Sequence, residues 1–315
     1  MGACGAKGWR NMTEDDAIRT ALEQFERTDA YRIFNAVLVT IYFVVLAGGV
    51  CGVIKMSFLL VKMNTLSVTT TAIINLVAIH SLFLVTVPFR LYYYISKNWV
   101  FGQYFCRFVS LMAHFHMYLT FLFYVIALII RFLIFFQWKD KVEFYRNLHA
   151  VATSAVVWIL TLALVLPLMH VCYGRNGNYQ NNTCFQFQQE LKKDGVKALN
   201  YVIITGVVLV TFGLLGLQVV IILKIVRKLS GSVWSHQEFR AQLKNLIFVC
   251  FIIFCFLPHH FFRIYYIQHV NDNQNLEIYN EICLSITAVS CLDLFPFVIS
   301  GGRLMRQKTM GLSCC

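Results

Sequence analysis

The sequence predicts an all-α membrane protein built as a bundle of seven transmembrane helices. The 315-residue chain is 58% hydrophobic and only 13% charged, about half the charged fraction of a typical water-soluble domain. Several uncharged apolar stretches also reach the roughly 20 residues that a helix needs to cross the hydrocarbon core of a bilayer. Segments of about 10 residues with alternating polarity, which would indicate a transmembrane β-barrel, are absent from the sequence.

Seven apolar runs bounded by charged or turn-forming residues mark the predicted spans. They lie at residues 33–61, 66–95, 103–136, 148–170, 197–226, 241–269 and 278–300. Residues 1–32 carry several acidic side chains and lack the apolar core of a cleaved signal peptide, so we expect them to form a soluble tail. No internal repeat or polar linker divides the rest, and residues 33–302 are therefore expected to form one bundle domain followed by a short segment at 303–315.

The charge distribution predicts the orientation of the bundle. An odd number of spans places the two termini on opposite sides of the membrane. The loops after spans one, three and five and the C-terminal segment are rich in Lys and Arg, which is typical of the cytoplasmic side. Glycosylation sequons begin at Asn11 and Asn181, both on the opposite side. We therefore expect a multi-pass plasma-membrane protein with an extracellular N-terminus and a cytoplasmic C-terminus.

Two of the 11 cysteines differ from the others in position. Most cysteines lie within predicted spans, where a reduced cysteine is an ordinary small apolar residue. Cys106 begins the third span on the outer side, and Cys184 lies in the loop between spans four and five, so both face an oxidising compartment. We expect a disulfide between them. The alternatives are two unpaired thiols, or a bridge that uses Cys172 at the end of the fourth span.

The landmarks of the spans resemble those of rhodopsin-like G-protein-coupled receptors, over about residues 33–312. They are Asn75-Leu76, Pro88, Trp99, Cys106, Arg131, Trp158, Cys255-Phe256-Leu257-Pro258-His259-His260 and Ser290-Cys291-Leu292-Asp293. A histidine and an arginine just outward of the proline in span six resemble the purinergic-like branch. Residues 60–65, 139–146 and 235–239 further resemble a group of orphan receptors in that branch, a likeness that supplies no ligand.

The resemblance implies a receptor with an extracellular ligand and a heterotrimeric G protein as partners, embedded in the lipid bilayer. It implies no catalytic residues, no cofactor or metal, and no nucleic-acid partner. Residues 303–312 resemble the short cytoplasmic amphipathic eighth helix of the family. Cys314 and Cys315 follow this segment and are candidate palmitoylation sites, with a pair of free cytosolic thiols as the alternative.

Three residues of the resemblance belong to the activation switch. Arg131 occupies the position that meets the G protein, Phe256 that of the aromatic switch, and Pro258 kinks span six so that its inner half can swing outward. Ile130 stands where the family usually has an acidic neighbour of the arginine. Because a local salt bridge is then missing, we expect raised basal activity or a weakened coupling switch.

A second departure concerns the polar centre of the bundle. His80 stands where the family usually keeps the aspartate that holds a sodium ion, whereas Asp293 remains on span seven. We expect His80 and Asp293 to form a hydrogen-bonded pair that replaces the ion, so that sodium should not modulate binding. A neutral histidine bonded to the backbone or to Asn75 is the alternative.

The outer halves of spans two, three and six carry candidate ligand-binding residues. These are Arg90, His114, Tyr118, His259, His260 and Arg263. Because guanidinium groups bind carboxylate or phosphate bidentately, this set favours an anionic ligand. The alternative is that Arg90 and Arg263, which lie near span ends, extend to lipid headgroups.

Other functions fit the sequence less well. A retinal-binding protein needs a lysine in the seventh span, and residues 278–300 contain none. A transporter would show repeats or lines of ionisable residues through the bundle. The remaining alternative is a receptor-like seven-helix binding or scaffold protein that does not couple to G proteins, because Ile130, Leu294 and Phe297 depart from the family pattern.

Overall fold

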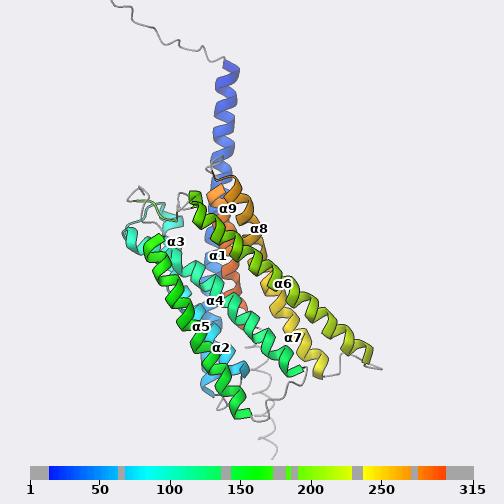
Figure 1. The fold of residues 1–315 in the computed structure, drawn as a ribbon. Coiled ribbons are helices and arrows are strands. Elements are labelled where there is room, and N and C mark those ends of the chain that lie inside the picture. Colours follow the sequence, from blue (N-terminus) through cyan, green and yellow to red (C-terminus); the bar gives the residue numbers. More distant parts are fainter. Residues whose placement is uncertain are drawn as a thin grey trace, which may run out of the picture.

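The computed structural model describes residues 14–62, 68–135, 143–172, 182–185, 191–228, 237–270 and 276–295. Within these ranges the chain forms a bundle of helices (Figure 1). The elements are α1 (Glu14–Lys62), α2 (Val68–Leu84), α3 (Val87–Ser96), α4 (Gln103–Phe135), α5 (Glu143–Cys172), α6 (Asp194–Lys228), α7 (Gln237–Phe251), the π-helix η3 (Ile252–Phe256), α8 (Leu257–Gln268), α9 (Leu276–Ala288) and the 3₁₀-helix η4 (Val289–Leu292).

Helices lie at all seven predicted spans, and the fold class is confirmed. In the part of the chain that the structure describes, five helical stretches are long and apolar enough to cross a membrane, at 29–62, 70–96, 103–130, 194–227 and 245–268. A shorter apolar helix covers Leu148–Ala163, and α9 with η4 forms the last predicted span. The segment that resembles an eighth helix lies outside the described residues.

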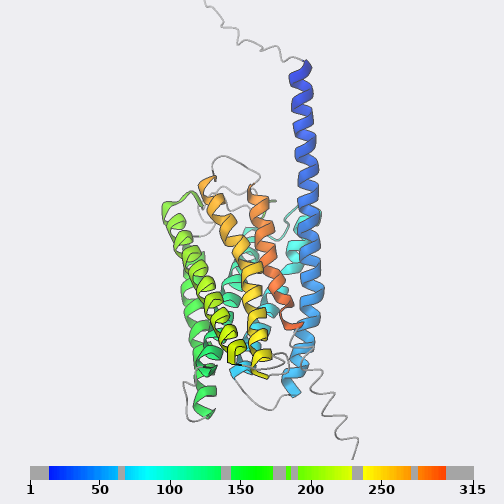
Figure 2. The same ribbon diagram turned by 90° about the vertical axis from the view of Figure 1, so that its right-hand side faces the viewer.

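The first helix begins earlier than the apolar pattern predicts. The sequence predicts a tail up to residue 32, whereas α1 begins at Glu14. Figure 2 shows that its N-terminal part continues well past the end of the bundle. The sequence from Glu14 to Phe25 is rich in Ala, Leu, Glu and Arg, which favour a helix even where no packing surface is present.

The second predicted span is two helices rather than one. Helix α2 ends at Leu84 and α3 begins at Val87, with Pro88 in its first turn. Proline has no N–H, and its ring clashes with the carbonyl four residues earlier, which here belongs to Leu84. At the break the Phe83 carbonyl accepts from both the Thr86 N–H, at 2.8 Å, and the Thr86 hydroxyl, at 2.7 Å. Pro88 therefore marks a break between α2 and α3 within one apolar span.

Close packing of α1 depends on small residues. A Cβ atom at Gly49 would lie 2.8 Å from Leu84 Cδ2 and 3.3 Å from Cys291 Cβ, so a larger residue would require the Leu84 side chain to move. Small residues of this kind let helices approach closely within a membrane, where lipid removes the hydrophobic drive for association. Helix α1 accordingly packs against α2, α3, α9 and η4.

Candidate functional site

The sixth predicted span contains a π-helix immediately before its proline. Residues Ile252–Phe256 form η3, and α8 begins at Leu257 with Pro258 in its first turn. A wide turn accommodates the proline ring, whose missing N–H leaves one carbonyl of the preceding turn without its usual helical donor. Such π-segments often occur at functional sites. The structure thus has a local irregularity where the sequence predicts a kink.

Phe256 lies at the end of this π-helix in the centre of the bundle. Its side chain is completely buried. Its ring centroid lies 6.2 Å from that of Phe121 and 6.2 Å from that of Tyr124, both on α4. Tyr124 also packs against Phe248 of α7, at 5.5 Å between centroids. The rings therefore connect α4 to both sides of the irregular turn.

The polar centre of the bundle lies next to these rings. His80 Nε2 lies 3.1 Å from Asp293 Oδ1, and the Tyr124 hydroxyl donates to the other carboxylate oxygen, Oδ2. All three side chains are buried, His80 and Tyr124 completely. The hydrogen-bonded pair that the sequence suggested is present in this arrangement, and sequence reasoning missed Tyr124 because a tyrosine in a span is most often an ordinary packing residue.

The alternative contact between His80 and Asn75 is not formed. The Asn75 amide donates to the Thr71 carbonyl and to the Ser154 hydroxyl, both at 2.8 Å, and its carbonyl accepts from Trp158 Nε1 at 2.9 Å. Asn75 therefore links α2 to α5. His80 instead turns its second nitrogen, Nδ1, toward His116 of α4 at 3.0 Å.

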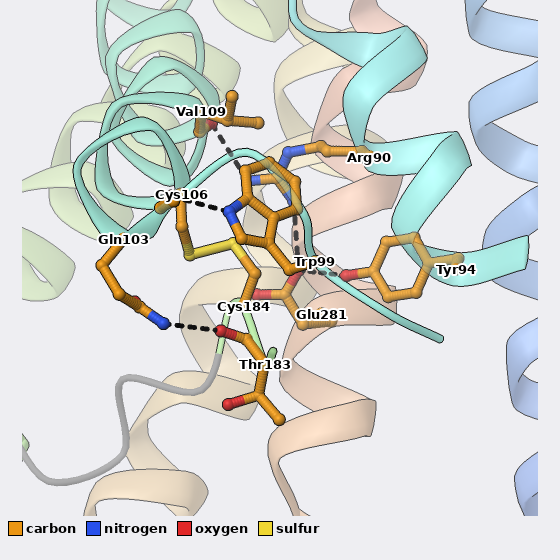
Figure 3. The surroundings of a disulfide bond; sticks show 10 residues. Arg90, Tyr94, Trp99, Gln103, Cys106, Val109, Thr183, Cys184 and Glu281 are labelled. Carbon is orange, nitrogen blue, oxygen red and sulfur yellow. Dashed lines mark hydrogen bonds and ion pairs between the residues drawn. A yellow bond between two sulfur atoms is a disulfide. The ribbon is translucent and has the colours of Figure 1, made fainter. Parts of the chain in front are cut away.

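Arg90 requires a correction to the predicted anion-binding set. Its side chain is completely buried rather than extended to headgroups, and its Nη1 lies 3.1 Å from Glu281 Oε2 (Figure 3). The same Nη1 lies 3.1 Å from the Tyr42 hydroxyl. The Tyr94 hydroxyl donates to the same Glu281 oxygen at 2.8 Å. A carboxylate of the chain itself thus neutralises this guanidinium, and Arg90 is not free to bind an external anion here.

The predicted disulfide is present and lies directly against this ion pair. Cys106 and Cys184 are bonded, joining the start of α4 to the loop that follows α5. Phe185, the residue after Cys184, is buried, and the Arg90 guanidinium carbon lies 4.3 Å from its ring centroid. Glu281, Tyr42 and Tyr94 could not be identified from the sequence, because residues on different spans become neighbours only in the folded bundle.

Arg263 of α8 has a different environment. Its Nε donates to Asn200 Oδ1 at 3.3 Å and its Nη1 to Asn280 Oδ1 at 3.0 Å. Among the residues that the structure describes, no acidic side chain pairs with it. Two amide oxygens orient the guanidinium without neutralising it, so its positive charge is left uncompensated.

The remaining predicted pocket residues gather around Arg263. The ring centroids of His260 and Tyr118 are 6.2 Å apart, and those of His259 and His260 are 5.4 Å apart. His114 lies on α4 one turn before Tyr118, and its Nδ1 lies 3.1 Å from the Ser110 carbonyl oxygen. Within the described ranges, the buried His259 Nδ1 has no hydrogen-bond partner. The structure therefore brings Tyr118, His259 and His260 into contact with one another.

Several predicted residues lie outside what the structure describes. Arg131 belongs to α4, but the placement of its side chain is not described. Asn11, Asn181, Cys314 and Cys315 lie outside the described ranges, as does Phe297. Their assigned roles stay predictions.

The arrangement of apolar helices, buried polar centre and irregular sixth span defines a helical membrane receptor. Residues 51–293 match the family described as 7 transmembrane receptor (rhodopsin family), and the chain belongs to this family of G-protein-coupled receptors. It is 55% identical over 282 residues to the human (Homo sapiens) protein named Probable G-protein coupled receptor 141, a match that covers 88% of this chain and 92% of that protein.

More distant relatives are receptors with named ligands. The chain is 25% identical to 2-oxoglutarate receptor 1 of Mus musculus, over 73% of this chain and 68% of that protein. It is 29% identical to cysteinyl leukotriene receptor 2 of Homo sapiens, over 60% of this chain and 55% of that protein. These matches are to receptors and not to enzymes.

Proposed function

We propose that this receptor binds an anionic extracellular ligand at Arg263 and the surrounding histidines, and that binding activates a heterotrimeric G protein. The observation that carries the proposal is the uncompensated Arg263 guanidinium, held by Asn200 and Asn280. A planar guanidinium fixed in orientation can bind a carboxylate or phosphate through two parallel hydrogen bonds. The partly buried surroundings strengthen such a charge-assisted contact relative to one in water.

The position of Arg263 connects ligand binding to activation. It lies on α8, directly outward of Pro258 and the π-helix, so a ligand that moves α8 acts on the irregular turn. A ligand shifts the equilibrium only by as much as its affinities for the two states differ. We therefore propose that the anion favours the state in which the inner half of this span, α7, has moved outward, with Arg131 available to the G protein.

Two further features support the proposal. Two of the distant relatives are named for carboxylate-bearing ligands, 2-oxoglutarate and cysteinyl leukotrienes. The orientation predicted from charge, with the N-terminus outside, places the disulfide and the outer end of α8 on the extracellular side. We further propose a plasma-membrane location, glycosylation at Asn11 and Asn181, and one bundle domain at residues 33–302 between an extracellular tail and a cytoplasmic segment.

The test is a carboxylate and phosphate screen on cells that express the full chain, with G-protein activation as the readout. An active anion should lose potency in Arg263→Ala and keep part of it in Arg263→Lys, because lysine retains the charge but not the bidentate geometry. Arg32→Ala is the matched control, since Arg32 is exposed on α1 and pairs with Asp29 instead. Equal potency in parent and Arg263→Ala would rule out this binding site.

A second function is supported by residues near the activation switch that differ from the family pattern. Ile130 precedes Arg131, and Leu294, which follows Asp293, is completely buried in the core. These features favour a receptor that binds its ligand without efficient G-protein coupling. Ligand binding that is measurable by radioligand, together with silence of every G-protein class, would support this second function.

A further inference from the structure

We propose that His80, His116 and Cys291 form a binding site for one divalent transition-metal ion, best suited to Zn²⁺, in the centre of the bundle. The proposal does not depend on the identity of the extracellular ligand. The three residues come from α2, α4 and η4, and each is at most 1% exposed. One potential ligand atom of each points toward the other two.

The spacing of the three atoms fits a tetrahedral metal centre. His80 Nδ1 and His116 Nε2 are 3.0 Å apart, and Cys291 Sγ lies 3.7 Å from the first and 3.3 Å from the second. With Zn–N of about 2.0–2.1 Å and Zn–S of about 2.3 Å, tetrahedral geometry requires N···N of about 3.3 Å and N···S of about 3.6 Å. Each observed separation differs from the ideal by only a few tenths of an ångström.

Neighbouring side chains hold the two histidine ligands of such a centre in place. A metal-binding histidine usually donates its second N–H to a carboxylate, which fixes the tautomer and the ring orientation. His80 Nε2 makes this contact with Asp293 Oδ1 at 3.1 Å, and Tyr124 holds the same carboxylate from its other side. The Phe83 ring stacks on His116 with centroids 4.3 Å apart and so restrains the second ligand.

In the metal-free cluster, one buried histidine nitrogen has no hydrogen-bond partner among the described residues. If His80 Nε2–H donates to Asp293, its Nδ1 has only a lone pair, which His116 Nε2–H can satisfy. His116 Nδ1 then has a lone pair as well, and among the described residues this buried nitrogen has no partner. A metal ion would take the lone pairs of both facing nitrogens, and His116 Nδ1 would then carry a proton that likewise has no acceptor among the described residues.

The donor set also determines which ion fits. Two imidazole nitrogens and a sulfur suit Zn²⁺ or copper, whereas sodium, calcium and magnesium require oxygen ligands. Binding of Zn²⁺ would release the Cys291 thiol proton to solvent or buffer. The resulting thiolate and the Asp293 carboxylate would together balance the two positive charges of the ion, so the buried centre would be neutral.

The experiment uses the full chain, purified in detergent through an antibody epitope rather than on a metal resin, and then loaded with Co²⁺ or Zn²⁺ alone. Co²⁺ should produce a thiolate-to-metal absorption band and the visible bands of a tetrahedral centre, and Zn²⁺ should remove both by displacement. Zinc should bind with one high-affinity equivalent per chain. Absence of the thiolate band in the folded parent protein would overturn the proposal.

Two pairs of variants locate the ion. Cys291→Ser should abolish the thiolate band, whereas Cys283→Ser on the neighbouring α9 should keep it, because Cys283 is remote from the cluster. Asp293→Asn should keep the band but weaken Zn²⁺ affinity by about 10- to 100-fold, the effect of losing an outer-shell carboxylate. A thiolate band of equal intensity in Cys291→Ser would show that the metal binds elsewhere. If Cys291→Ser does not fold, loss of the band in His116→Gln provides the same test.

Discussion

Arg90 and Glu281 form a buried charged pair between α3 and α9, with Tyr42 and Tyr94 satisfying further hydrogen bonds. Such a pair adds little stability compared with apolar residues of the same shape, because both charges must lose their hydration. Removing one partner has a much larger effect, since the other charge is left buried. Arg90 therefore belongs to the buried structural core of the bundle.

We predict that Arg90→Met and Glu281→Leu each destabilise the receptor by roughly 3–5 kcal/mol, whereas the double variant recovers most of this loss. The midpoint of thermal unfolding of purified protein measures the effect. Arg32→Met is the control, because Arg32 is exposed and should leave the midpoint unchanged. Additive losses in the double variant would show that the two charges do not interact.

The polar centre leads to a prediction about sodium. In place of an ion held by oxygen atoms, the structure has His80 bonded to Asp293. We therefore expect thermal stability to be the same in NaCl and in choline chloride at equal ionic strength. His80→Asp, which restores a second carboxylate, should make the receptor more stable in sodium. Sodium stabilisation of the parent, or its absence in a folded His80→Asp variant, would count against this account.

At the scale of single elements, η3 and α8 determine how the sixth span can bend. The π-helix from Ile252 to Phe256 and the following Pro258 interrupt the regular hydrogen bonding between α7 and α8. Such an irregular turn can bend at lower cost than a regular helix, because fewer hydrogen bonds must be broken. The Phe256 side chain lies at this turn and is enclosed by α4.

Pro258→Ala tests the role of the turn. The alanine variant can form a continuous α-helix, so we expect its thermal stability to be retained or raised while G-protein activation is reduced. Activation at matched surface level and the unfolding midpoint are measured together. The control is Pro88→Ala, which alters the proline at the break between α2 and α3. Unchanged activation in Pro258→Ala would mean that the bend is not required.

The helices themselves were largely predictable from the sequence. A helix that crosses the hydrocarbon core must be a long run of apolar residues, and charged residues mark its ends. The breaks within the helices could be predicted only in part. Pro88 and Pro258 mark both breaks, but the π-helix and the separate start of α3 at Val87 depend on local packing. The early start of α1 at Glu14 was missed because helix propensity, not hydrophobicity, determines that segment.

At the scale of the whole molecule, we propose three layers of function along the axis of the bundle. The outer layer contains Arg263 and its histidines, the middle layer contains His80, Asp293 and Tyr124, and the inner end contains Arg131 on α4. Sequence reasoning identified at least one residue in each layer. It missed the partners Glu281, Tyr124, His116 and Cys291, since contacts between distant spans are not encoded in local spacing.

Tyr124 connects these layers. Its ring packs against Phe248 of α7, and its hydroxyl holds Asp293. Outward movement of the inner half of α7 would separate Phe248 from this ring. Tyr124→Phe removes the hydrogen bond while retaining the ring, so it should loosen the observed arrangement by about 1 kcal/mol, or about a fivefold shift between states.

The most direct test of the account is ligand-free G-protein activation, measured for every class at matched surface level in the parent, Tyr124→Phe and Tyr124→Phe/Arg131→Ala. We predict that Tyr124→Phe raises the signal of one class about fivefold, and that Arg131→Ala abolishes this increase. Silence of Tyr124→Phe in all classes, or a signal that persists without Arg131, would contradict the account of this chain as a receptor that couples through its inner arginine.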